Sequence, residues 1–214
     1  FFVSFFCLAL ICISNIFFLA VLAVEIESAW ANFVQFAMGG LIGSWIAHMF
    51  IKGHSSVLIH EVKHSIVSNL VGNRAKGMRI QRKSGHFKYS YTKATEKYNA
   101  LIALAPYFLP VFTFATTLAA HIIYAQTYYK LLFVVGAGFG MDMILNWRDV
   151  SPIQTDLTNI TGGYKVGVAF VTLMNLAIFT FLLAWVLDGG QGLKFLFAAL
   201  WESMVHVVAY YRGL

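Results

Sequence analysis

The sequence His60-Glu61-Val62-Lys63-His64 fits the pattern H-E-x-x-H and lies among long apolar segments. On a helix, His60 and His64 share one face, so both imidazoles can reach one zinc ion. Glu61 lies beside them, where its carboxylate can take a proton from water at the metal. Polar side chains are costly in hydrocarbon and are usually functional there. The motif therefore predicts a zinc site among membrane helices.

The composition is that of a membrane protein with several spans. The chain has 214 residues, of which 59% are hydrophobic and 11% are charged, and its mean hydropathy is +0.73. These values are typical of helices that pack against one another in lipid. The two cysteines, Cys7 and Cys12, lie in the first apolar run, so the sequence indicates neither a disulfide framework nor a cysteine-ligated metal.

The net charge of +6 is concentrated in one block. Between Arg74 and Lys97 there are eight lysines and arginines and a single acid, Glu96. Beside membrane spans, such a block marks a cytoplasmic segment near anionic lipid headgroups. We therefore expect the lipid bilayer as a partner, and no nucleic acid.

The predicted fold is a mainly α-helical, polytopic membrane bundle of about six membrane segments, with a short β-hairpin after the motif helix. We expect one integral membrane domain over residues 1–214, in a bacterial-type inner membrane. Its parts are a first span at residues 1–24, a second span and the motif helix at 33–71, the hairpin at 76–92, core spans with an Asp-bearing segment at 98–187, and a C-terminal helix at 191–211.

The motif helix is predicted from His54 to Val71, with a C-cap at Gly72-Asn73. It is too polar to face lipid, so we expect other helices to enclose it. If it crosses the membrane fully, Lys52-Gly53 lies on the side opposite the hairpin. If it only dips into the bundle, the sidedness upstream is reversed.

Alternating residues predict the hairpin. Met78 and Ile80 alternate with polar residues, as do Phe87 and Tyr89, and residues 83–85 read Lys-Ser-Gly as a turn. An exposed strand edge can pair with an extended peptide.

Prolines indicate where helices bend, and glycines indicate where helices pack closely. Pro106 and Pro110 should kink or divide the apolar stretch from Tyr98 to Ala125. Small residues let helices approach closely, and we expect close packing at two groups of glycines: Gly39, Gly40, Gly43 and Gly136, Gly138, Gly140.

Catalytic zinc needs three protein ligands and an open position, so a third ligand must join the two histidines. Asp142, in a glycine-rich helix, is also a candidate for a structural hydrogen-bond partner. The acidic candidates away from the interface and the basic block are Asp142, Asp149, Asp156, Asp188 and Glu202.

With these features, residues 33–187 resemble the site-2 protease family of intramembrane zinc metalloproteases. The resemblance rests on the H-E-x-x-H motif in a membrane helix, then a hairpin, a span and a downstream aspartate. It implies Asp156 as the third zinc ligand. In the family this aspartate follows a segment that contains Asn and Pro, which match Asn146 and Pro152 here, and Thr155 is the Ser/Thr-type residue directly before it. Asp188 is the alternative, because Leu187-Asp188-Gly189 matches the family tripeptide but follows a span.

The resemblance also implies a function. We expect a Zn²⁺ metalloprotease that hydrolyses peptide bonds of membrane-embedded proteins or peptides, with Glu61 as catalytic residue and Asn146 positioning the substrate. Lys63 opposes metal binding unless it extends away or pairs with an acid. The alternative is therefore an inactive, protease-like scaffold within a larger membrane complex. A di-iron oxidase would need more histidine pairs.

Overall fold

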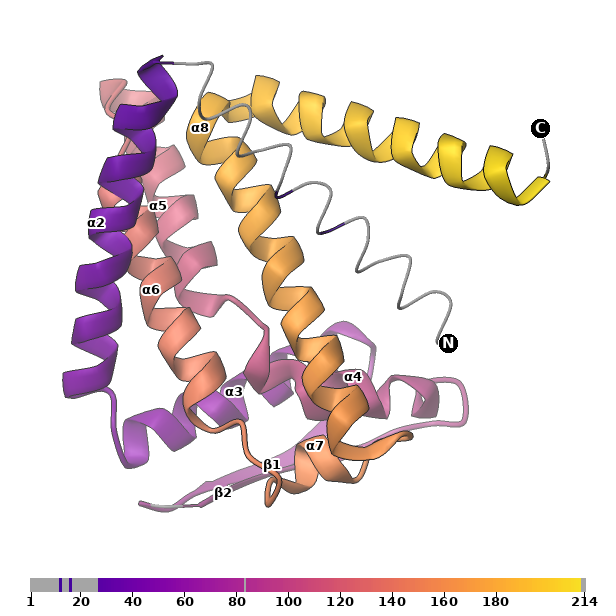
Figure 1. Ribbon diagram of the computed structural model, residues 1–214. Coiled ribbons are helices and arrows are strands. Elements are labelled where there is room, and N and C mark those ends of the chain that lie inside the picture. The colour runs from indigo at the N-terminus through magenta and orange to yellow at the C-terminus, as the bar shows by residue number, and fades with distance from the viewer. Residues whose placement is uncertain (1–11, 13–15, 17–26, 83, 213–214) are drawn as a thin grey trace. The chain divides into compact units, whose positions relative to one another are not determined.

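The computed structural model describes residues 12, 16, 27–82 and 84–212. The expected first span at residues 1–24 lies outside the described residues, apart from Cys12 and Ile16. The chain divides into two compact units, residues 38–171 and residues 1–37 with 172–214. In chain order the elements are α2 (Glu27–Phe50), α3 (His54–Leu70), β1 (Arg74–Ile80), β2 (Gly85–Ser90), η1 (Glu96–Tyr98), α4 (Asn99–Leu104), η2 (Ala105–Tyr107), α5 (Val111–Thr127), α6 (Leu132–Arg148), α7 (Thr155–Thr158) and α8 (Gly163–Arg212) (Figure 1).

Helix α3 carries the H-E-x-x-H motif, begins at the expected residue and ends at Leu70, one residue before the expected end. It begins after Gly53, whose φ of 59° suits a glycine, and it ends before Gly72, whose φ is 84°. The Asn73 amide donates to the carbonyl of Ser68 at 3.0 Å, which closes the helix end. The predicted helix is confirmed, and its C-cap is Val71, with Gly72 as the next residue.

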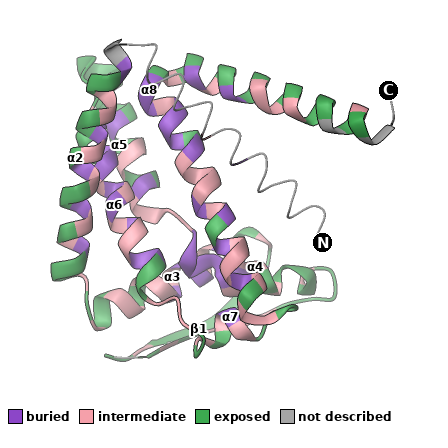
Figure 2. Ribbon diagram, viewed as in Figure 1, coloured by how far each residue is buried: buried purple, intermediate pink, exposed green. Residues whose placement is uncertain are grey.

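The β-hairpin is also confirmed. Strands β1 and β2 pair in antiparallel register from Arg74 with Ser90 to Ile80 with Gly85, with an irregularity between Ala75 and Gly77. Both strands pack against α3. Figure 2 shows that β1 is exposed along nearly all of its length. The hairpin therefore covers one side of the motif helix and presents its basic residues outward.

Helix α6 packs between α2 and α5 through glycines. A methyl group at Gly43 would overlap the Ala137 carbonyl, and one at Gly140 would overlap the Gly40 carbonyl. On the α5 side, the position of a Cβ at Gly138 lies 2.7 Å from the carbonyl oxygen of Phe112. The predicted close packing is confirmed, because each of these contacts requires the absence of a side chain.

The proline-containing segment is bent as predicted. Residues Glu96–Tyr107 and Val111–Thr127 meet at 74° across a short break that contains Pro110. Pro106 opens the turn of η2. The bend confirms that proline divides this stretch.

The count of membrane segments differs from the expected six. Among the described residues, two helical stretches are long and apolar enough to cross a membrane, Ala29–Phe50 and Gly163–Tyr210, or three if the bent pair is one span. Helix α6 has 17 residues, which gives about 26 Å, less than the hydrocarbon core of about 30 Å. The two helices expected after residue 166 are both present within α8, where they meet at a kink with non-helical backbone angles at Asp188 and Gly189.

The unit formed by residues 1–37 and 172–214 has its own apolar core. The start of α2 packs against α8 through buried alanine and leucine side chains, with the Asn32 side-chain amide donating to the Leu187 carbonyl at 3.2 Å. The core residues are Ala29, Leu183, Ala184, Leu187 and Leu196.

Candidate metal centre

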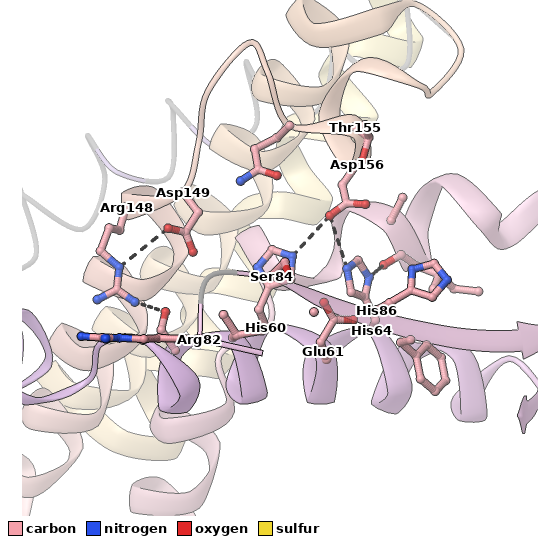
Figure 3. Close-up of a pocket in the computed structure, with 18 of the residues that line it drawn as sticks. His60, Glu61, His64, Arg82, Ser84, His86, Arg148, Asp149, Thr155 and Asp156 are labelled. Atoms are coloured by element: carbon pink, nitrogen blue, oxygen red, sulfur yellow. Dashed lines mark hydrogen bonds and ion pairs between the residues drawn. The ribbon is translucent and has the colours of Figure 1, made fainter. Parts of the chain in front are cut away.

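Three potential metal ligands meet in the unit formed by residues 38–171. His60 and His64 project from one face of α3, and Asp156 comes from the short helix α7 (Figure 3). The Oδ2 atom of Asp156 lies 3.3 Å from Nε2 of His60 and 3.4 Å from Nε2 of His64. All three ligand atoms lie within 4.8 Å of one another, so this group could hold a metal ion.

The distances suit a small divalent cation. Zinc–nitrogen and zinc–oxygen bonds in a tetrahedral site place neighbouring ligand atoms about 3.4 Å apart. The two distances from Asp156 to the histidine nitrogens match this separation. The Asp156 carboxylate therefore lies at a distance from each histidine that a bound zinc ion could bridge.

The surroundings of His64 favour a cation. Its Nδ1–H donates to the Ile102 carbonyl at 2.7 Å, which leaves Nε2 facing the Asp156 carboxylate. A lone pair against a carboxylate is unfavourable unless a proton or metal ion lies between them. Burial acts to lower the pKa of His64, but the hydrogen bond and charge of Asp156 outweigh it and raise that pKa. Burial acts to raise the pKa of Asp156, but the two histidines hold it well below its usual range.

Leu157 explains why Asp156 points at the histidines. Helix α6 ends at Arg148, and after a turn the chain starts α7, in which the Leu157 and Thr158 amides both donate to the Gln154 carbonyl. Leu157 is fully buried, and α7 packs against α4. Burial of this one side chain fixes the short helix and aims the neighbouring carboxylate.

Glu61 lies in the same cavity as the three ligands. The cavity has a volume of about 730 Å³ and is lined by α3, the hairpin, α4 and the connection between α6 and α7. Glu61 is 6% exposed. A Cβ atom at Gly85 would overlap its carboxylate and would lie 2.7 Å from Cγ1 of Val57. The sequence marked Gly85 as a turn residue, but its position against Glu61 depends on how the hairpin folds over α3.

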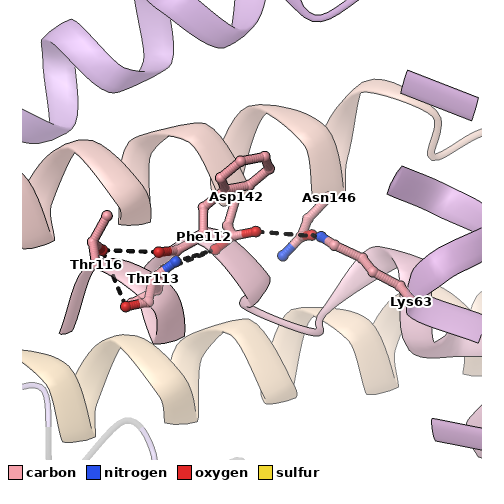
Figure 4. A network of polar contacts seen from close by, with 6 residues as sticks. All are labelled: Lys63, Phe112, Thr113, Thr116, Asp142 and Asn146. Atoms are coloured by element: carbon pink, nitrogen blue, oxygen red, sulfur yellow. Dashed lines mark hydrogen bonds and ion pairs between the residues drawn. The ribbon is translucent and has the colours of Figure 1, made fainter. Parts of the chain in front are cut away.

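Lys63 points away from the cavity. Its ammonium group donates to Oδ1 of Asn146 at 2.7 Å and to Oδ1 of Asp142 at 3.4 Å (Figure 4). The other carboxylate oxygen of Asp142 accepts from the Thr113 amide at 2.7 Å and from the Thr113 hydroxyl at 2.9 Å. Lys63 therefore pairs with an acid, and the structural role expected for Asp142 is confirmed.

Two other expected site residues lie elsewhere. Asn146 is buried and accepts a hydrogen bond from Lys63. We expected it to position the substrate, but it does not line the cavity. The difference arises because Asn146 lies one turn after Asp142 on α6, on the face that meets Lys63. Asp188 lies at the kink of α8, in the other unit, and is not a member of the ligand group.

No protein-family model, curated protein or solved structure matches the chain. Any functional inference therefore depends on the residues and on their geometry.

Proposed function

We propose that this chain is an intramembrane zinc endopeptidase of the site-2 protease type, which hydrolyses peptide bonds of membrane-embedded substrates. The observation that carries the proposal is the convergence of His60, His64 and Asp156 with Glu61 in one cavity. Two imidazole nitrogens and one carboxylate oxygen are a donor set of catalytic zinc, which keeps its fourth position for water or substrate.

In the proposed reaction, individual residues of the cavity have separate roles. When bound, zinc polarises the scissile carbonyl and lowers the pKa of water. Glu61 accepts the proton of the attacking water and delivers it to the departing amine nitrogen, so the peptide C–N bond breaks as the new C–O bond forms. The Ile102 carbonyl accepts from Nδ1–H of His64 and so favours the tautomer whose Nε2 would be free to hold a metal ion.

The hairpin supplies a means of holding an extended substrate. Phe87 and Tyr89 of β2 line the cavity, and within the described residues β2 pairs with β1 alone. A membrane-spanning substrate is helical and keeps its peptide groups bonded internally, so it must unwind before it is cut. Strand addition at β2 would satisfy the peptide groups of the unwound segment.

Metal analysis and cleavage assays of the full chain in detergent test the proposal. We expect close to one zinc per chain in the wild type and loss of zinc in Asp156→Ala. The matched control Asp188→Ala should keep its zinc. Glu61→Gln should keep the zinc and lose cleavage of membrane peptides by a factor of about 10² or more.

Three results would contradict the proposal. A purified wild-type protein without zinc would refute the metal centre. Full cleavage by Glu61→Gln would refute the role of Glu61. Zinc without cleavage of any membrane peptide would favour the inactive scaffold instead.

A further inference from the structure

Three cationic side chains converge on the end of the cavity nearest His60. Lys52 comes from the α2–α3 connection, Arg82 from the hairpin tip and Arg148 from the end of α6, and all three line the cavity. Figure 3 shows Arg82 and Arg148 at the same end. The convergence joins three separate parts of the chain at one place.

The two arginines contact the connection between α2 and α3 and the start of α3. The Arg148 guanidinium donates to the Ile51 carbonyl at 2.6 Å and to the Ser56 hydroxyl, one helical turn before His60. The Cγ atom of Arg82 lies 3.7 Å from the position of a Cβ at Gly53. Both arginines therefore lie against the short connection that carries Lys52.

Three carboxylates also line the cavity, and within the described residues only Asp149 forms an ion pair with one of the three cations. Asp149 pairs with Arg148, its Oδ1 lying 3.8 Å from Nε. Lys52 and Arg82 form no ion pair within the part of the chain that the structure describes. Like charges gathered in a concave site repel one another and attract an anion.

We propose that Lys52, Arg82 and Arg148 form a subsite for a carboxylate of the substrate peptide. This inference rests on the proposed function and names a substrate class for it. The rise of one helical turn from Ser56 to His60 is about 6 Å, which equals about two residues of extended peptide. The carboxylate therefore lies about two residues from the bond that is cut, as a Glu or Asp side chain or as a peptide C-terminus.

The location of the cluster favours a peptide over a lipid headgroup. Other cations of the basic block, such as Arg79 and Lys88, do not line the cavity. Lys52, Arg82 and Arg148 instead share the cavity with the candidate metal ligands. An anion in contact with them would lie beside the reacting peptide.

Binding of hydroxamate peptides to the zinc-loaded full chain tests the subsite without requiring turnover. The probes carry a metal-binding hydroxamate and Glu, Gln or Lys two residues from it, on either side. We expect the Glu probe to bind about tenfold more tightly than the Gln probe, the effect of one charge-assisted hydrogen bond. Arg82→Gln should bring this ratio close to one, whereas the matched control Arg79→Gln should keep it.

Each other outcome overturns the inference. Equal binding of the Glu, Gln and Lys probes to the wild type refutes the subsite and leaves the metal proposal standing. An unchanged ratio in Arg82→Gln, or an equal fall in Arg79→Gln, refutes the assigned residues. Failure of every hydroxamate to bind refutes the metal centre and the subsite with it.

Two further arms identify the source of the anion. A probe with a free C-terminal carboxylate, compared with its amide, separates a peptide terminus from an acidic side chain. Vesicles containing anionic phosphatidylglycerol serve as the lipid probe. If they abolish the wild-type preference for Glu while neutral vesicles do not, the cluster binds headgroups and the peptide subsite is refuted.

Discussion

Lys63 shows how a charge inside the motif is accommodated without facing the metal. Its side chain is 1% exposed and its ammonium group meets Asp142 and Asn146. Asp142 in turn accepts from the Thr113 amide in the first turn of α5, where backbone donors lack helical partners. The motif helix is thus joined to α5 and α6 through one buried ion pair.

We predict that Lys63→Met strongly destabilises the protein. The substitution leaves the Asp142 charge buried without its cation, at a cost of about 3–5 kcal/mol in the free energy of unfolding. The double variant Lys63→Met/Asp142→Asn should recover much of that loss. Urea unfolding in detergent measures both, and a single variant as stable as the wild type would contradict the importance of the pair.

Gly85 gives a second prediction at the scale of a residue. A valine there would overlap the Glu61 carboxylate, so Gly85→Val should lower peptide cleavage about 10²-fold, as expected for a displaced general base. Zinc content should stay unchanged because the three ligands are not touched. Ala75→Val, on the exposed strand β1, is the matched control. Loss of zinc in Gly85→Val would show that the hairpin acts on the metal site instead.

At the scale of elements, α7 depends on Leu157 to present the third ligand. We predict that Leu157→Ala lowers zinc affinity about 10- to 100-fold without changing any ligand, an effect typical of supporting residues. Ile153, which is 89% exposed in the same connection, provides the control Ile153→Ala. Competition with a chelator measures both affinities, and equal affinities for the two variants would refute the anchoring role.

Local patterns made some of these elements predictable. The spacing of His60 and His64 and the alternation in the hairpin are properties of short segments, so the sequence was sufficient to predict both. The pairing of Lys63 with Asp142 joins residues 79 positions apart, and no local pattern indicates it. The sequence also could not predict that the Ile102 carbonyl accepts the hydrogen bond of His64. Every residue has a carbonyl, and only the tertiary fold decides which one lies beside the histidine.

The break between the last two helices is another local feature that the sequence made predictable. Asp188-Gly189-Gly190 resembles a helix terminator, and we expected two helices there. Asp188 and Gly189 have non-helical backbone angles, with a positive φ of 57° at Gly189, so α8 consists of two helices that meet at a kink. Glycine permits the bend, while the flanking residues Leu187 and Leu196 are buried in the same core.

At the scale of the whole molecule, large apolar side chains on the described helices stay exposed to the surroundings. Large apolar side chains are exposed along three helices, such as Leu41 on α2, Phe114 on α5 and Trp201 on α8. In water these surfaces would favour aggregation, whereas in lipid they match the hydrocarbon. In lipid, stability would come from close packing between helices, because lipid supplies no hydrophobic drive for their association.

Glycine substitutions test that dependence on close packing. A methyl group at Gly140 would overlap the Gly40 carbonyl, so Gly140→Ala should destabilise the protein by about 1–3 kcal/mol through overpacking of α2 against α6. A methyl group at Gly190 would meet no atom within 4 Å. Gly190→Ala should therefore be neutral, or stabilising by about 0.4–1 kcal/mol, because alanine restricts the unfolded chain. Thermal unfolding in detergent distinguishes the two, and equal melting temperatures for both variants would show that the α2–α6 contact adds nothing to stability.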